Sequence, residues 1–267
     1  MITKLLEKEI NKSSSKISIL VRELNSTNTI YKYNADKQFV SASTIKVFIL
    51  LTALDEVKKG TIALDTFLEV PKKEILEGTK VFEHGPTKCS LEELLNWMII
   101  NSDNTATNVL IEQFSIDTID KYIKETLDLK NTTLQRKMLD FDAIKNGKNN
   151  YISQNDMYIT FDKIFNKTIL TPKLCNKAIE ILRNQRSKAM ITRYIYQNVL
   201  FANKPGSLEG LINDSGVMCI NKKLYYVGIF IHDYKTKEEA LKLIGTLGKI
   251  IYNYLNQYSK EKENVRS

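Results

Sequence analysis

The chain has 267 residues, of which 43% are hydrophobic and 26% are charged, as is typical of a globular protein with one large domain or two entwined ones. Its formal charge of +8 and pI near 9.1 suggest nucleic acid as a partner, but the lysines are scattered among Asp and Glu, so we expect no nucleic-acid binding. No apolar run is long enough to cross a membrane, and we expect no membrane partner.

The N-terminal part is predicted to form a helix, a hairpin and a second helix. Residues 1–10 carry acids inside an amphipathic pattern, which indicates a helix and not a signal peptide. Residues 16–24 and 29–34 are rich in β-branched side chains and flank a turn cluster, so they predict a β-hairpin. The next helix is expected to begin near Ser43 and to end at Gly60.

The middle of the chain is predicted to be helical. Ser90 and Glu93 have the spacing of a capping box, which marks the start of a helix. The helices expected here cover residues 90–101, 104–114, 116–127, 156–165 and 171–183. Residues 69–89 are interpreted as a polar connection, and residues 130–150, dense in Asn, Lys and Asp, as a long ordered loop.

The C-terminal part is predicted to return to strands, at residues 199–203, 210–220 and 223–231, before a closing helix at residues 236–258. Strands at both ends predict an α/β (α+β) fold, with an antiparallel sheet of N- and C-terminal strands flanked by helices and an inserted all-helical domain. We predict a discontinuous sheet domain of residues 1–40 and 190–267 and a helical domain of residues 41–189, with the active site between them.

The cysteines and histidines argue against a metal or a disulfide framework. Cys89, Cys175 and Cys219 are odd in number and have no Cys-x-x-Cys spacing, while His84 and His232 are isolated. We therefore expect no cofactor and no metal. We expect a monomer, in the cytoplasm for the sequence as given and outside it if a leader was removed.

The stretch Ser43-Thr44-Ile45-Lys46 carries the first sign of chemistry. On a helix, residues three apart are neighbours, so the Ser43 hydroxyl and the Lys46 amine can share a proton. Alone this spacing is weak, because Ser13 to Lys16 and Ser259 to Lys262 match it too, and a capping serine followed by a solvated lysine is the commoner case.

Two further motifs lie at element boundaries. Ser102-Asp103-Asn104 separates two predicted helices, and Lys204-Pro205-Gly206-Ser207 lies on the first of the later strands. Each has an ordinary structural explanation, an N-cap for the first and a strand end for the second. Together, in this order, the three motifs indicate function.

These motifs resemble the three-part signature of the class A β-lactamases and the related penicillin-binding proteins. Ser43-Thr44-Ile45-Lys46 is similar to their nucleophile motif, Ser102-Asp103-Asn104 to the second motif and Lys204-Pro205-Gly206 to the third. The similarity extends along residues 91–111 and through the whole order of elements. It implies a β-lactamase/transpeptidase-like fold.

The resemblance also implies a role for each residue. Ser43 would attack the carbonyl of a β-lactam or D-alanyl peptide, with Lys46 taking or relaying the proton and Ser102 passing it to the leaving nitrogen. Asn104 would bind the substrate's amide side chain, and Lys204 would attract its carboxylate. The oxyanion hole would be the backbone N–H groups of Ser43 and Ser207, beside Gly206.

Two departures from the family pattern limit this assignment. Where class A enzymes have a glutamate two residues after an arginine, this chain has Met138 after Arg136, and a thioether cannot activate water. Deacylation should be slow unless Asp140, Asp142 or a shifted loop substitutes. In the third motif Pro205 replaces Thr or Ser, which removes a hydroxyl and a backbone donor for the substrate carboxylate.

Two hypotheses follow from these residues. The first is a class A β-lactamase-like serine hydrolase that acylates at Ser43 and turns over poorly. The second is a penicillin-binding or peptide-sensing protein that acylates without efficient turnover. A degenerate homologue without this chemistry is a third, which the intact motifs disfavour.

Overall fold

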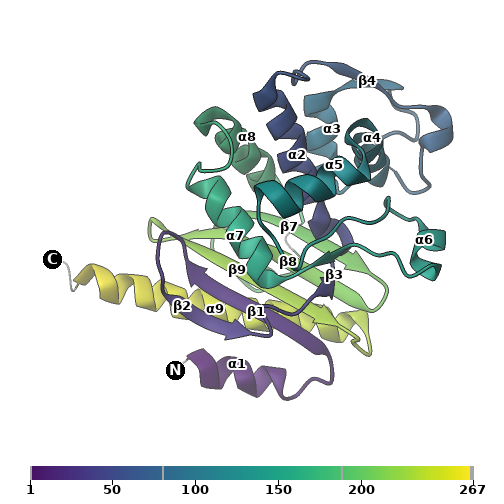
Figure 1. The fold of residues 1–267 in the computed structure, drawn as a ribbon. Helices are drawn as coiled ribbons and strands as arrows, with labels where there is room; N and C mark the ends of the chain where they lie inside the picture. The colour runs from purple at the N-terminus through teal and green to yellow at the C-terminus, as the bar shows by residue number, and fades with distance from the viewer. Residues whose placement is uncertain (1, 80, 188, 265–267) are drawn as a thin grey trace. The chain divides into compact units, whose positions relative to one another are not determined.

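The computed structural model describes residues 2–79, 81–187 and 189–264. Its main sheet is antiparallel with the strand order β2-β1-β9-β8-β7, so strands from both ends of the chain build it, as predicted (Figure 1). The strands are β1 (Lys16–Glu23), β2 (Thr29–Tyr33), β7 (Leu200–Leu208), β8 (Leu211–Ile220) and β9 (Lys223–His232). Asn221 and Lys222 join β8 to β9 with φ values of 47° and 61°, which suits the right-handed twist of a hairpin.

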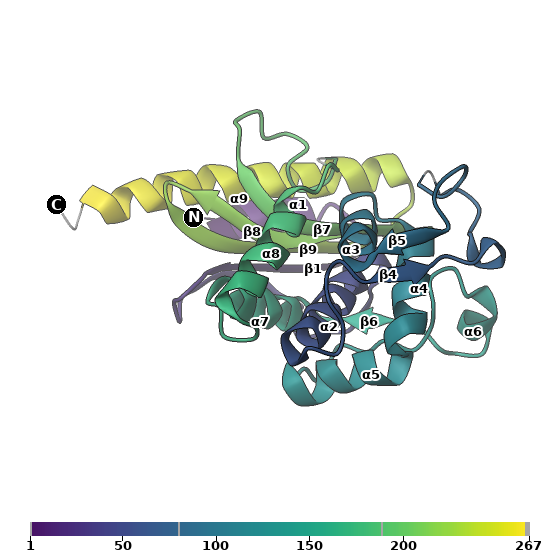
Figure 2. The ribbon, with the colours of Figure 1, turned by 90° about the horizontal axis from the view of Figure 1, so that it is seen from above.

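The chain divides into two compact units, the first comprising residues Met1–Thr44, Ser153–Asp162 and Ser187–Ser267, the second Ile45–Ile152 and Lys163–Arg186. In the first unit, α1 (Ile2–Ile10) and α9 (Lys237–Asn264) lie along one face of the sheet (Figures 1 and 2). Apolar side chains from α1, α9 and alternate strand positions form a continuous core there, with Leu6, Ile229 and Leu255 fully buried.

The opposite face of the sheet carries the other set of alternating side chains. Tyr226 on β9 packs edge-on against Tyr158 of α7 (Gln154–Phe165), with ring centroids 5.7 Å apart. Further along β9, His232 is only 8% exposed, and its Nε2 lies 3.0 Å from Oδ1 of Asn213 on β8. Asn213 and His232 are therefore enclosed and paired with each other.

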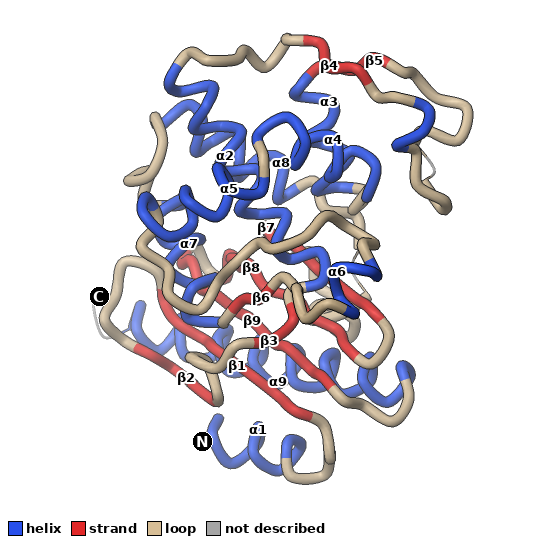
Figure 3. The backbone as a smooth tube through the Cα atoms, turned by 45° about the vertical axis from the view of Figure 1, so that its right-hand side comes forward, coloured by secondary structure: helices blue, strands red, loops and turns tan. Residues whose placement is uncertain are grey.

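The second unit is built around α2 (Lys46–Lys59). Every residue from Lys46 to Asp55 is buried, because α2 is surrounded by α3 (Leu91–Ile100), α4 (Asn104–Phe114), α5 (Ile116–Lys121) and α8 (Pro172–Arg183) (Figure 3). Gly60, in the left-handed conformation at φ 78°, ends α2 as predicted. A helix buried on all sides is hydrophobic all round, as the run Val47–Leu51 is.

Several predicted boundaries differ from the structure. The helix expected near Ser43 starts as a 3-10 turn, η1 (Ala42–Ile45), and becomes α-helical at Lys46. The connection at 69–89 contains a short helix, η2 (Lys72–Glu74), and its two ends pair as β4 (Phe67–Glu69) and β5 (Lys88–Ser90). These pairings join residues about twenty positions apart, which local patterns do not reveal.

Other differences concern the loop at 130–150 and the helix that precedes it. The loop contains α6 (Phe141–Lys145), and β6 (Tyr151–Ile152) follows it; α5 continues as a π-helical turn, Tyr122–Thr126. The remaining strand, β3, is Phe39–Val40. The capping box at Ser90 and Pro172 in the first turn of α8 are confirmed. Among the described residues, no helix combines the length and apolarity needed to span a membrane.

The buried His232 predicts a pH dependence of stability. Burial lowers its pKa from 6.5 to about 4; Asp233 opposes this shift to a smaller extent, and Lys16 adds to it. Between these pH values the unfolded chain binds the proton and the folded chain does not. The contribution of neutral, buried His232 to the free energy of unfolding is therefore complete above pH 6.5 and is lost as the pH falls towards 4.

We therefore expect wild-type protein to lose up to about 3 kcal/mol more unfolding free energy between pH 7 and pH 4 than His232→Gln. Urea unfolding at several pH values measures the difference. Parallel curves for the two proteins would contradict the prediction.

Candidate active site

The predicted site residues of the second unit come together around one buried amine. Lys46, the first residue of α2, is 0% exposed, and its Nζ donates to the Ser102 carbonyl oxygen at 2.7 Å and to Asn104 Oδ1 at 2.9 Å. Its Nζ also lies 3.3 Å from Ser102 Oγ. The hydrogens of a buried amine need such acceptors, because a buried polar group without a hydrogen-bond partner costs free energy.

The turn that carries Ser102 is shaped by its neighbours. Ser102 has φ 55°, a left-handed conformation that costs a serine about 1 to 2 kcal/mol. The next residue, Asp103, caps α4 by accepting from the Ala106 N–H at 2.8 Å, and it also accepts from the Thr79 hydroxyl. The cap and the Lys46 contact together hold the Ser102 carbonyl and hydroxyl towards the amine.

The predicted residues of the first unit meet at the turn that precedes α2. Ser43 lies in η1, and Gly206 of β7 packs directly against it. A Cβ on Gly206 would lie 2.7 Å from the Ser43 backbone nitrogen and 3.1 Å from the Ala42 Cβ. Only glycine allows strand and turn to approach this closely. Ser207, the following residue, is exposed at the surface of the first unit.

Lys204 of β7 lies one strand away from a carboxylate that the motifs did not indicate. Its side chain is 0% exposed, and burial lowers its pKa to about 7, an effect that Asp214 on β8 opposes. Asp214 accepts from Asn203 Nδ2 at 2.8 Å and from the Ile191 N–H at 3.3 Å, and burial raises its pKa to about 6. The polar run at residues 213–215 in an otherwise apolar strand was the sequence signal for this group.

The loop after Arg136 places Met138 with its side chain buried. Met138 is 7% exposed, and its backbone is held at both ends by Asn108 of α4, which accepts from the Met138 N–H at 2.7 Å and donates to its carbonyl at 3.1 Å. The Arg136 guanidinium donates to Asn149 Oδ1 at 2.9 and 3.1 Å. Asn108 thus fixes the backbone of Met138.

The two nearby acids are engaged elsewhere. Asp140 caps α6 by accepting from the Ala143 N–H at 2.9 Å. The Asp142 side chain is 89% exposed and pairs with Lys145 at 3.3 Å. Both carboxylates therefore already have partners within their own segment of the chain.

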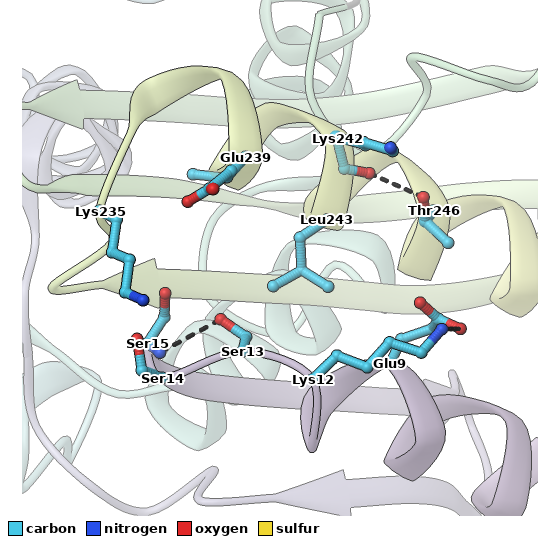
Figure 4. Close-up of a pocket in the computed structure, with 11 residues that line it drawn as sticks. Glu9, Lys12, Ser13, Ser14, Ser15, Lys235, Glu239, Lys242, Leu243 and Thr246 are labelled. Atoms are coloured by element: carbon cyan, nitrogen blue, oxygen red, sulfur yellow. Dashed lines mark hydrogen bonds and ion pairs between the residues drawn. The ribbon is translucent and has the colours of Figure 1, made fainter.

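Two hollows lie on the surface of the first unit. One, of about 360 Å³, lies between the turn after α1 and the start of α9, and exposed residues such as Lys12, Ser14 and Lys235 line it (Figure 4). None of the predicted site residues lines this hollow. The other, of about 560 Å³, includes Ser207 and Tyr234 in its wall. Within the described part of the chain, no cluster of acids, cysteines and histidines could hold a metal ion.

Solved structures show which known fold this chain adopts. A class A β-lactamase from Bacteroides cellulosilyticus superimposes with a TM-score of 0.85 at 23% identity, covering 96% of this chain and 97% of that one. The structure of PBP-A gives a TM-score of 0.85 at 21% identity, again covering 96% and 97%. The fold is β-lactamase/transpeptidase-like, an antiparallel sheet flanked by helices.

Comparisons of the sequence show to which family of this fold the chain belongs. The chain is 24% identical to beta-lactamase VEB-1 of Pseudomonas aeruginosa, with 95% of this chain and 90% of that protein aligned. The model of the beta-lactamase enzyme family, Beta-lactamase2, matches residues 1–255. This chain belongs to the beta-lactamase enzyme family.

The close approach of β7 to the Ser43 turn predicts the effect of a single methyl group. Gly206→Ala would force that group against the Ser43 backbone, and we expect a loss of about 1 to 3 kcal/mol of unfolding free energy from overpacking. Ser207→Ala, one residue on and exposed, is the control and should change stability by less than about 0.5 kcal/mol. Equal denaturation midpoints for the two variants would refute this account of the turn.

Proposed function

We propose that this protein is a class A β-lactamase-like serine hydrolase that forms an acyl-enzyme at Ser43 with β-lactams or related amides and releases it slowly. The observation that carries the proposal is the buried Lys46 amine, held at Ser102 and Asn104 and following Ser43 by one helical turn along the chain. An amine in contact with a second hydroxyl can move a proton from a nucleophile to a leaving group.

In the proposed reaction, the Ser43 oxygen attacks the amide carbonyl and the C–N bond of the substrate breaks. Lys46, as a neutral amine, takes the Ser43 proton and returns it to Ser102, whose own hydroxyl proton goes to the leaving nitrogen. Asn104 uses Oδ1 for Lys46, which leaves its Nδ2 to donate to the substrate's amide side chain. Water then attacks the ester, which restores Ser43 and releases the acid.

The charge that forms on the carbonyl oxygen would be stabilised by the backbone N–H groups of Ser43 and Ser207. The packing of Gly206 against the Ser43 nitrogen supports this role, since it brings β7 beside one of the two donors. Losing one such donor typically slows acyl transfer by about 10²- to 10³-fold. Lys204 would attract the substrate carboxylate, and the lowered pKa of its buried amine makes that attraction weaken as the pH rises above about 7.

Slow release is inferred from Met138. Met138 aligns with the position at which the resembled family has its glutamate, and its thioether is buried and cannot act as a base, while Asp140 and Asp142 are a helix cap and a solvent-exposed ion pair. General-base catalysis typically contributes about 10²- to 10⁴-fold. Its loss would leave an acyl-enzyme that accumulates.

The same observation favours a second candidate, a penicillin-binding or peptide-sensing protein that acylates without efficient turnover. One solved variant of the structurally similar PBP-A is an acyl-enzyme complex with penicillin G; it has a TM-score of 0.85 and 21% identity and covers 96% of each chain. The two candidates share acylation at Ser43 and differ in whether hydrolysis follows.

Intact mass spectrometry after mixing with penicillin G tests the nucleophile. We expect wild-type protein to gain the mass of the drug and Ser43→Ala to gain none, because the alanine has no oxygen to acylate. A persistent adduct supports the non-hydrolysing candidate, and a transient adduct with opened drug supports the hydrolase. An adduct of equal yield on Ser43→Ala would show that the nucleophile is another residue.

Replacing Met138 tests the cause of slow release. We expect Met138→Glu to speed deacylation by about 10- to 100-fold, because the new carboxylate can activate water. Met138→Gln has the same size without a base and should deacylate like the wild type. The rate at which each adduct decays after excess drug is removed gives the comparison, and equal rates in both variants would contradict the proposed role of position 138.

A further inference from the structure

A side-chain amide on β8 holds the backbone just before Ser43. Nδ2 of Asn213 donates to the carbonyl oxygens of Val40 at 2.9 Å and Ser41 at 3.2 Å. Asn213 is 0% exposed and lies opposite Gly206 in the pairing of β7 with β8. The two protons of one amide group therefore fasten two successive peptide groups of the chain that leads to Ser43.

The orientation of that amide is determined by its partners. Carbonyl oxygens only accept, so the atom facing Val40 and Ser41 must be nitrogen, and Oδ1 of Asn213 must point the other way. There it lies 3.0 Å from Nε2 of His232, which must carry a proton to donate. The lowered pKa of this buried histidine keeps it neutral, so it is the Nε2–H tautomer that fixes the amide.

The carbonyl that Asn213 holds is also the acceptor that closes the Ser43 turn. Ser41 O accepts from the Thr44 N–H at 3.2 Å and from the Thr44 hydroxyl at 2.6 Å. Between these two residues, Ala42 has φ 46°, in the left-handed region that alanine avoids. Such strain persists only where the surroundings over-determine the conformation.

A ring contact completes the support. Phe39 of β3 packs edge-on against the His232 ring, with centroids 4.8 Å apart, and tilted against Phe230 at 5.9 Å. The segment before Ser43 is thus held by a ring at Phe39 and by an amide at the next two residues. On the other side of the turn, the backbone of Gly206 packs directly against the Ser43 nitrogen and limits its movement.

We propose that Asn213, oriented by His232, is a positioning residue that keeps Ala42 in its left-handed conformation and thereby sets the Ser43 hydroxyl and N–H for acylation. The proposal rests on the proposed acylation at Ser43. Asn213 itself touches no reacting atom. Its effect should therefore fall on the rate of bond formation, not on binding of the substrate before reaction.

The test compares the acylation rate constant and the dissociation constant of the non-covalent complex, both measured with penicillin G by rapid quench and intact mass. We expect Asn213→Ala to slow acylation by about 10- to 100-fold, as a displaced reacting group typically does, and to change the dissociation constant by less than about threefold. Amide hydrogen exchange of residues 39–45 should become faster in this variant.

A matched control lies at the other end of β8. Asn221, in the β8–β9 turn, donates to Ser259 Oγ at 2.7 Å, so Asn221→Ala also loses a side-chain amide and some stability but leaves the Ser41 carbonyl untouched. It should acylate at the wild-type rate. If Asn213→Ala does not fold, two variants of His232 test the proposal instead. His232→Phe keeps a ring against Phe39 but lacks the donor, and it should slow acylation at least about tenfold. His232→Gln can still donate to Asn213 and should acylate close to the wild-type rate.

Three results would overturn the proposal: wild-type acylation in Asn213→Ala, an equal slowing by Asn221→Ala, or identical rates in His232→Phe and His232→Gln. A wild-type protein that forms no Ser43 adduct would instead refute the proposed function. In that case amide hydrogen exchange of residues 39–45 still tests the positioning role of Asn213, since this measurement needs no substrate. Unchanged protection of residues 39–45 in Asn213→Ala would reject it.

Discussion

The burial of one amine is the constraint on which the second unit depends. Lys46 stands at the start of a helix that is apolar on all sides and is itself closed off from solvent. Its amine can remain there only with acceptors in place, and the structure supplies the carbonyl and hydroxyl of Ser102 and the amide oxygen of Asn104. The left-handed conformation of Ser102 and the Asp103 cap together direct the Ser102 oxygens towards the Lys46 amine.

In the first unit, the corresponding constraint is the shape of the turn that holds Ser43. The hydroxyl is presented by a strained turn whose carbonyl, at Ser41, accepts from both the turn and the sheet. The sheet supplies the amide of Asn213 and the gap at Gly206, both from paired positions on neighbouring strands. Rigid strands thus support a turn that local preferences alone would not produce.

The sequence predicted the parts of this molecule that have local causes. Gly60 ends α2, the Ser90 capping box begins α3 and Asn221-Lys222 turns β8 into β9, because each depends on a few adjacent residues. The three motifs were found in the same way. The structure supports the grouping of Lys46 with Ser102 and Asn104 and of Ser43 with Gly206, while the chemical roles of these residues stay predictions.

What the sequence could not provide are contacts between distant residues. Nothing near Asn213 or His232 indicates that they face each other or the Val40 and Ser41 carbonyls, since these contacts arise only when β8, β9 and β3 come together. The sequence also did not reveal that Asp214 lies near Lys204 or that Asn108 binds the Met138 backbone, because these contacts too join residues from different elements. The β4–β5 pair was hidden because its strands are too short to show a period.

Pro205 has a consequence for the outer edge of the sheet. β7 is the last strand in the order, so one of its sides forms no strand pairing within this sheet, although residues 202–206 are buried. Proline is tolerated there because it removes a backbone donor that an edge strand does not need for its own sheet. The residue expected to weaken the binding of a substrate carboxylate therefore stands on a terminal strand, where the sheet tolerates a proline.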